Sequence, residues 1–84
     1  MYTWQFSEQA TKDFKKLPKE IQKRCVKKLD YFVSSEMPLQ FAESLINYEI
    51  GQYRFRIGDY RVIFDVEGEI LVILAVGHRR EIYK

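Results

Sequence analysis

Residues 53–64 have the sequence Tyr53-Arg54-Phe55-Arg56-Ile57-Gly58-Asp59-Tyr60-Arg61-Val62-Ile63-Phe64. Every second residue on each side of Gly58-Asp59 is aromatic or aliphatic, which is typical of two β-strands that bury one face. A two-residue connection that begins with glycine favours a type II′ hairpin turn. The register that follows pairs Phe55 with Val62, Arg56 with Arg61 and Ile57 with Tyr60. The apolar face of this hairpin should therefore pack into the core.

The rest of the chain predicts an α+β fold. Tyr2–Phe6 alternates like a strand, Ser7 caps a helix that ends near Leu17, and a second helix runs from Lys19 to about Ser34. Residues 39–51 predict a short turn and a loop, and Ile70–Val76 is apolar enough for a central strand. The predicted order is β-α-α-β-β-β. We expect an antiparallel sheet with a helical hairpin on one face, in a single domain over residues 1–84, and the neighbour of the first strand is left open.

Composition excludes several classes of protein. The chain has 84 residues with 46% hydrophobic residues, which is too apolar for a disordered tail. The apolar run Ile70–Val76 is far shorter than the roughly 20 residues of a membrane span. Cys25 is the single cysteine, so neither an internal disulfide nor a zinc site is expected. We expect a cytoplasmic protein that uses no metal and no other cofactor.

The hairpin face that points away from the core carries Arg54, Arg56 and Arg61. Opposed side chains in a sheet have Cβ atoms about 4.5–5.5 Å apart, so Arg56 and Arg61 repel unless an anion neutralises them. The planar guanidinium suits phosphate, which predicts a phosphate-binding site. The alternative is a solvated face on which Asp59 and Asp65 form structural salt bridges with the arginines.

The C-terminal residues 77–84 follow the central strand and should emerge near the same face. They contain His78, the one histidine of the chain and a residue type suited to proton transfer near neutral pH, and Tyr83, which offers a stacking ring and a phenol. Beside the arginines these residues favour a site that handles RNA. Taken singly, His78 is also compatible with a surface histidine, and Tyr83 with an aromatic anchored on the core.

The chain combines GQYRFRIGDYRVIF at residues 51–64 with VGHRREIY at residues 76–83. With these two motifs together, the sequence resembles the RelE/ParE superfamily of bacterial and archaeal toxins. FKKLP at residues 14–18 and AESL at residues 42–45 also match the family pattern. The resemblance covers essentially the whole chain and implies a RelE-like fold.

The resemblance implies an activity and roles for individual residues. RelE-like members are endoribonucleases that cut mRNA in the ribosomal A site by attack of the 2′-hydroxyl on the adjacent phosphate. Arg54 and Arg56 match basic residues beside the scissile phosphate, and Arg61 matches the arginine that stabilises the transition state. Arg79 matches the basic residue after the final strand, and Tyr83 the tyrosine that stacks on a base or aids proton transfer. The implied partners are the ribosome, mRNA and a cognate antitoxin.

The sequence offers more than one candidate for the general base of such a reaction. Arginine stays protonated and is a poor general base, so His78 or Glu43 must serve, or the ribosome must supply positioning. Two alternatives to the nuclease remain: a ParE-like toxin that inhibits DNA gyrase, and a degenerate toxin kept for its antitoxin contacts. An acidic amphipathic antitoxin segment is expected on the basic sheet face beside Leu45, Ile46 and Ile63.

The helices carry a further basic feature. A stripe along their outer face, with Arg80, is predicted to contact ribosomal RNA, and its residues are Lys12, Lys16, Lys19, Lys23 and Lys27. The alternative is a face that simply keeps the helices solvated.

Overall fold

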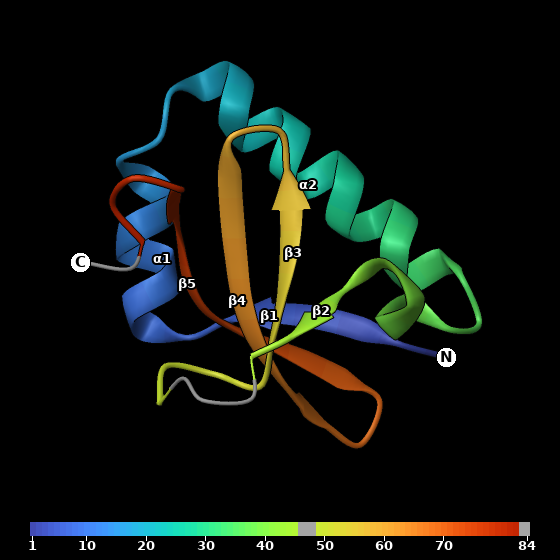
Figure 1. The fold of residues 1–84 in the computed structure, drawn as a ribbon. Helices are drawn as coiled ribbons and strands as arrows, with labels where there is room; N and C mark the ends of the chain where they lie inside the picture. Colours follow the sequence, from blue (N-terminus) through green and yellow to red (C-terminus); the bar gives the residue numbers. More distant parts are fainter. Residues whose placement is uncertain (46–48, 83–84) are drawn as a thin grey trace.

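The computed structural model describes residues 1–45 and 49–82. Its elements, in chain order, are β1 (Thr3–Phe6), α1 (Glu8–Lys15), α2 (Lys19–Ser34), the 3-10 helix η1 (Pro38–Phe41), β2 (Glu43–Ser44), β3 (Tyr53–Ile57), β4 (Tyr60–Glu67) and β5 (Ile70–His78). The α+β class, the helical hairpin and the three-strand meander at the end of the chain are confirmed. Both helices pack on one face of the sheet (Figure 1).

The sheet is mixed, with the strand order β1-β5-β4-β3-β2. An entirely antiparallel sheet was expected, and this is corrected by β1, which pairs in parallel with β5 from Thr3 opposite Ile70 to Phe6 opposite Ile73. After β1, the two helices carry the chain across one face of the sheet. β1 therefore lies at one edge of the sheet and runs in the same direction as β5. At the other edge, β2 is a strand where a turn or loop was expected, and it pairs antiparallel with β3. The apolar β5 lies between two strands, as predicted for a central strand.

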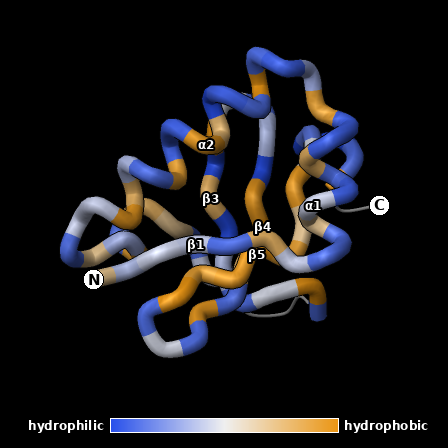
Figure 2. Tube along the Cα trace, turned by 180° about the vertical axis from the view of Figure 1, so that it is seen from behind, coloured by the Kyte–Doolittle hydropathy of each residue, from blue (hydrophilic) through white to orange (hydrophobic). Residues whose placement is uncertain are grey.

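The helices form where the sequence predicts them because their ends carry suitable residues. Ser7 caps α1 by accepting a hydrogen bond from the Ala10 amide at 3.1 Å. Pro18 precedes the first turn of α2, whose buried residues are Cys25, Leu29 and Phe32. Figure 2 shows α2 alternating between hydrophilic and hydrophobic residues along its length, whereas β5 is hydrophobic over most of its length. One face of α2 therefore covers the sheet, and the other faces solvent.

The aromatic core lies under the strand that carries two of the arginines. Phe55 of β3 is fully buried, and its ring centroid lies 4.3 Å from Phe32 of α2 and 4.4 Å from Phe64 of β4. These contacts join α2 to the hairpin. Because Phe55 stands between Arg54 and Arg56 in the sequence, its burial turns both arginines to the opposite face of the sheet.

A β-bulge interrupts the pairing of β4 with β5. Ile63 lies opposite Ala75, whereas the next residue, Phe64, lies opposite Ile73, so Leu74 is one extra residue in β5. The extra residue shifts the alternation of β5 by one position. As a result Ile73 and Val76 both point into the core, although the two residues between them would place them on opposite faces of a regular strand.

In the described part of the chain, no helix is both long and apolar enough to span a membrane.

Candidate phosphate-binding site

The predicted register of the hairpin is confirmed. Arg56 lies opposite Arg61, Phe55 opposite Val62 and Ile57 opposite Tyr60. Gly58 has φ of +60° and Asp59 does not have a positive φ, which is the combination that a type II′ turn needs. The two opposed arginines therefore share the sheet face that the helices leave open.

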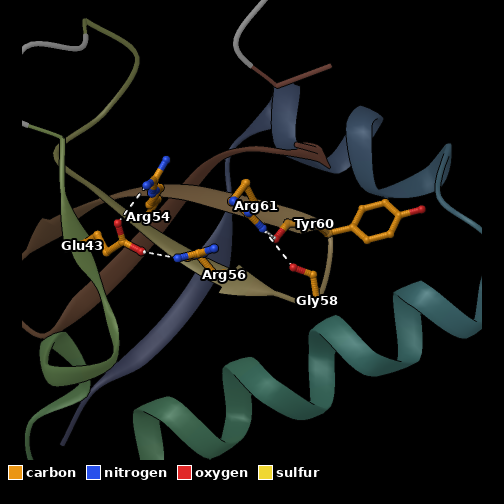
Figure 3. Close-up of polar contacts among 6 residues, drawn as sticks. All are labelled: Glu43, Arg54, Arg56, Gly58, Tyr60 and Arg61. Carbon is orange, nitrogen blue, oxygen red and sulfur yellow. Dashed lines mark hydrogen bonds and ion pairs between the residues drawn. The ribbon is translucent and has the colours of Figure 1, made fainter. Parts of the chain in front are cut away.

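Arg61 turns toward the hairpin turn. Its Nη1 atom donates to the carbonyl oxygens of Gly58 and Tyr60, each at 3.0 Å (Figure 3). The residue is 6% exposed, and it is the one buried charged residue in the described part of the chain. Gly77 lies directly opposite Arg61 on β5. The guanidinium is thus held by backbone groups of a tight turn, which fixes its position before any ligand arrives.

Arg54 and Arg56 turn the other way, toward Glu43 on β2. Arg54 Nη2 lies 2.8 Å from Glu43 Oε2, and Arg56 Nη1 lies 3.4 Å from Glu43 Oε1 (Figure 3). The hydrogen bond from Arg54, reinforced by the positive charge of both arginines, holds the pKa of Glu43 below its usual value. Arg56 and Arg61 therefore diverge from one another, and each has its own partners.

The two aspartates considered as partners of these arginines have other contacts. Asp65 accepts a hydrogen bond from the Gln52 amide at 2.9 Å. Asp59 lies 3.7 Å from Arg79 Nε, and its carbonyl accepts from the Arg79 amide at 2.8 Å. The structure therefore brings Arg79 to the same turn that holds Arg61.

The C-terminal turn folds back over the end of β5. A Cβ atom added at Gly77 would lie 3.4 Å from Cδ1 of Ile82, so glycine leaves room for Ile82 to pack there. Arg80 is exposed on this turn. Tyr83 lies outside the described residues, so its predicted contribution stays a prediction.

His78 lies on the other side of the sheet from the arginines. It pairs with Tyr60, and the two rings meet edge to face at 5.4 Å. Both residues line a pocket of about 290 Å³ with Lys16 and Pro18, at the junction of α1 and α2. The expectation that His78 emerges on the arginine face is thus wrong, and the cause is the bulge at Leu74, which changes the side to which the end of β5 points.

Sequence reasoning missed one arginine beside this site. A Cβ atom added at Gly58 would lie 3.0 Å from Nη1 of Arg24, so this side chain of α2 reaches the hairpin turn. The turn is therefore approached by Arg24 from α2, by Arg61 from β4 and by Arg79 from the turn that follows β5. The available signal was the helical position of Arg24 next to Cys25, which is buried in the core.

The apolar residues expected beside the arginines are not available for a partner. Leu45 is buried, and Ile63 is completely buried although it lies on the arginine side of β4. A Cβ atom at Gly51 would lie 2.5 Å from Cγ2 of Ile63, so the backbone before β3 covers this side chain. This corrects the expected exposed patch for Leu45 and Ile63, while Ile46 lies outside the described residues.

The predicted lysine stripe is exposed throughout, and its members are Lys12, Lys16, Lys19, Lys23 and Lys27. Lys23 and Lys27 border a groove of about 530 Å³ between the helices, with Phe14 and Val26 among its other residues.

Changing Lys16, Lys19 and Lys23 together to glutamine is expected to weaken binding to ribosomes about tenfold or more at low salt. Each lost phosphate contact also lowers the number of counterions that are released on binding. The affinity should therefore depend less steeply on salt concentration. Binding measured over a series of salt concentrations checks this. The control is the double variant K15Q/K28Q, which removes two positive charges from helix positions outside the stripe. An unchanged affinity and slope would leave the stripe as a solvated helix face.

Comparisons with known proteins agree on one family. The model of the ParE toxin of type II toxin–antitoxin systems (parDE) matches residues 5–83. Among solved structures, the RelBE2 toxin–antitoxin complex from Mycobacterium tuberculosis contains a chain that is 33% identical, with a TM-score of 0.79, over 93% of this chain and 98% of that one. The RelE–RelB complex from Pyrococcus horikoshii OT3 gives 29% identity and a TM-score of 0.72 over 95% and 97% of the two chains. The RelB–RelE complex from Methanococcus jannaschii gives 28% and 0.72, over 93% of each chain.

A comparison with curated protein sequences finds no match. With a family model over nearly its whole length, and with RelE-like structures as neighbours, the chain belongs to the RelE/ParE superfamily of toxins. It is a toxin of the type II toxin–antitoxin class.

Proposed function

We propose that this toxin, acting as one domain, is an endoribonuclease that cuts mRNA on the ribosome. The observation that carries the proposal is the placement of Arg61, which is buried, held by the carbonyls of Gly58 and Tyr60, and opposed to Arg56 on the open sheet face. A fixed cation of this kind suits the charge that develops on a phosphate during cleavage. Arg79 at the same turn adds a second positive charge.

The proposed reaction needs charge neutralisation and two proton movements. In-line attack by the 2′-oxygen forms a new bond to phosphorus and breaks the bond to the 5′-oxygen, which leaves a 2′,3′-cyclic phosphate and a 5′-hydroxyl. The 2′-hydroxyl loses a proton, and the 5′-oxygen gains one. Arg54, Arg56 and Arg61 can neutralise the phosphate, but a guanidinium that stays protonated cannot accept the 2′-hydroxyl proton. We expect little dependence on added metal ions.

Neither residue considered as general base suits that role in the free protein. The hydrogen bond from Arg54 lowers the pKa of Glu43 and makes it a weaker base, and His78 faces the helices. The proposal therefore assigns much of the rate to positioning, because holding the 2′-oxygen in line with phosphorus is something a bound ribosomal substrate does well. Free RNA should be cut poorly.

Inhibition of DNA gyrase is the second candidate function. The observation that favours it is the family model, which describes ParE toxins and matches residues 5–83. Primer extension on translated mRNA, run beside a gyrase supercoiling assay, separates the two. Ribosome-dependent cleavage without loss of supercoiling supports the nuclease. Loss of supercoiling without cleavage supports the gyrase inhibitor, and neither activity would indicate a degenerate toxin.

We also infer a cognate antitoxin. The solved relatives from Mycobacterium tuberculosis, Methanococcus jannaschii and Pyrococcus horikoshii are toxin–antitoxin complexes, and the exposed face of β3 offers Arg56 to an acidic segment. Expression of this chain alone should slow growth, and co-expression of the protein encoded beside it should restore growth. Equal growth with and without that neighbour would argue against the inference.

A further inference from the structure

The carboxylate of Glu43 lies between two arginines on the open sheet face. Arg54 contacts one of its oxygens, Oε2, at 2.8 Å, and Arg56 contacts the other, Oε1, at 3.4 Å (Figure 3). The three side chains come from neighbouring positions, because Glu43 of β2 lies directly opposite Arg54 of β3. Each arginine thus contacts its own oxygen of a single anion.

This arrangement is also one that a phosphate group can adopt. Two non-bridging oxygens of a phosphodiester carry the charge, and arginine recognises carboxylate and phosphate with the same planar set of donors. The two guanidinium groups, which converge on the two Glu43 oxygens, can converge on two phosphate oxygens with little rearrangement. A carboxylate and a phosphate cannot both occupy this place, because both are negatively charged.

We propose that Glu43 occupies the place of a substrate phosphate between Arg54 and Arg56 in the free protein, and that a phosphate of single-stranded RNA displaces it. The proposal rests on the proposed function, since that function supplies the RNA ligand. It assigns Glu43 the role of an internal competitor rather than that of a general base. It also gives Arg54 and Arg56 a partner that keeps their charge neutralised until RNA binds.

The surroundings of Glu43 allow its side chain to leave without disturbing the strand. The Glu43 side chain is 46% exposed, so it has open solvent to rotate into. The next residue but one, Leu45, is buried and donates its amide to the Gln52 carbonyl at 2.8 Å. This buried residue keeps β2 beside β3 while the carboxylate moves.

Displacement can be observed directly at the Glu43 carboxyl carbon by NMR on the folded wild-type protein with labelled glutamate. In the free protein the pKa of Glu43 is held low by the hydrogen bond from Arg54. Addition of inorganic phosphate, or of an RNA oligonucleotide with 2′-O-methyl groups that cannot be cut, should raise this pKa toward the ordinary glutamate value, because the arginines then bind the ligand. Glu67, an exposed glutamate at the far end of β4, should not respond. A pKa of Glu43 that stays low with RNA bound would overturn the proposal and leave a purely structural salt bridge.

The variant Glu43→Gln provides a second measurement. Gln keeps the size of the side chain but removes the competing charge, so the uncleavable RNA should bind about three- to tenfold more tightly. Glu67→Gln removes the same charge from another exposed position and should change the affinity less than twofold. Equal or weaker RNA binding by Glu43→Gln, with its melting temperature unchanged, would contradict the proposal.

The two proposals can fail separately. Displacement of Glu43 by phosphate and RNA, without mRNA cleavage on ribosomes, would refute the nuclease and leave the anion exchange intact. Cleavage on ribosomes, with the pKa of Glu43 unaffected by bound RNA, would refute the exchange alone.

Discussion

Replacing Arg61 with alanine is expected to lower the rate of mRNA cleavage on ribosomes by about 10²–10³-fold, the loss that typically follows removal of a fixed transition-state donor. The effect should be this large because the guanidinium is buried and held by the carbonyls of Gly58 and Tyr60. Substrate binding should change much less, since the proposed phosphate contacts of Arg54 and Arg56 would remain. Single-turnover primer extension at saturating toxin measures the rate separately from binding.

The control for this prediction is Arg61→Lys. Lysine keeps the charge but lacks the planar set of donors that reaches two carbonyls, so it should restore only part of the rate. Melting temperatures of both variants show whether the hairpin is still folded. Full activity of a folded Arg61→Ala protein would remove Arg61 from the mechanism.

Replacing Phe55 with alanine is expected to reduce the free energy of unfolding by about 3–5 kcal/mol, the usual cost of removing a buried phenylalanine. This is a large share of the total, because domains unfold at about 5–15 kcal/mol. Phe55 is fully buried between Phe32 and Phe64, so no neighbour can easily fill the space. Urea denaturation followed by tryptophan fluorescence gives the value.

Met37, which is 68% exposed, provides the matched control. Met37→Ala should change the free energy of unfolding by no more than about 0.5 kcal/mol. Similar losses for the two variants would show that the aromatic stack is not the main support of the hairpin. Because Phe55 orients the strand that carries Arg54 and Arg56, its loss should also weaken binding of RNA.

The hairpin and its register could be predicted because the sequence fixes the phase of both strands. Gly58 supplies the positive φ of the turn, and the alternation on each side leaves a single pairing that buries the aromatic residues. Arg56 opposite Arg61 follows from that pairing alone. The partners of these arginines did not follow, because Glu43 lies on a two-residue strand that no periodicity reveals.

The side of His78 could not be predicted, for a related reason. β5 is apolar at nearly every position from Ile70 to Val76, so its sequence contains no alternation that would show an extra residue. A bulge at Leu74 is therefore invisible in the pattern, yet it decides which face the following residues share. The burial of Ile63 escaped prediction because it depends on the distant backbone at Gly51.

The two edge strands of the sheet also affect whether toxin molecules aggregate at high concentration. β2 is only two residues long and carries a charged Glu43, and β1 is only four residues long. In β1, the indole of Trp4 donates a hydrogen bond to Asp30 of α2 at 2.8 Å, which links this edge strand to the helix. Edge strands that are short, charged or held by a helix expose little backbone with which a strand of another molecule could pair. Aggregation of toxin molecules by edge-to-edge strand pairing is therefore disfavoured at both edges of the sheet.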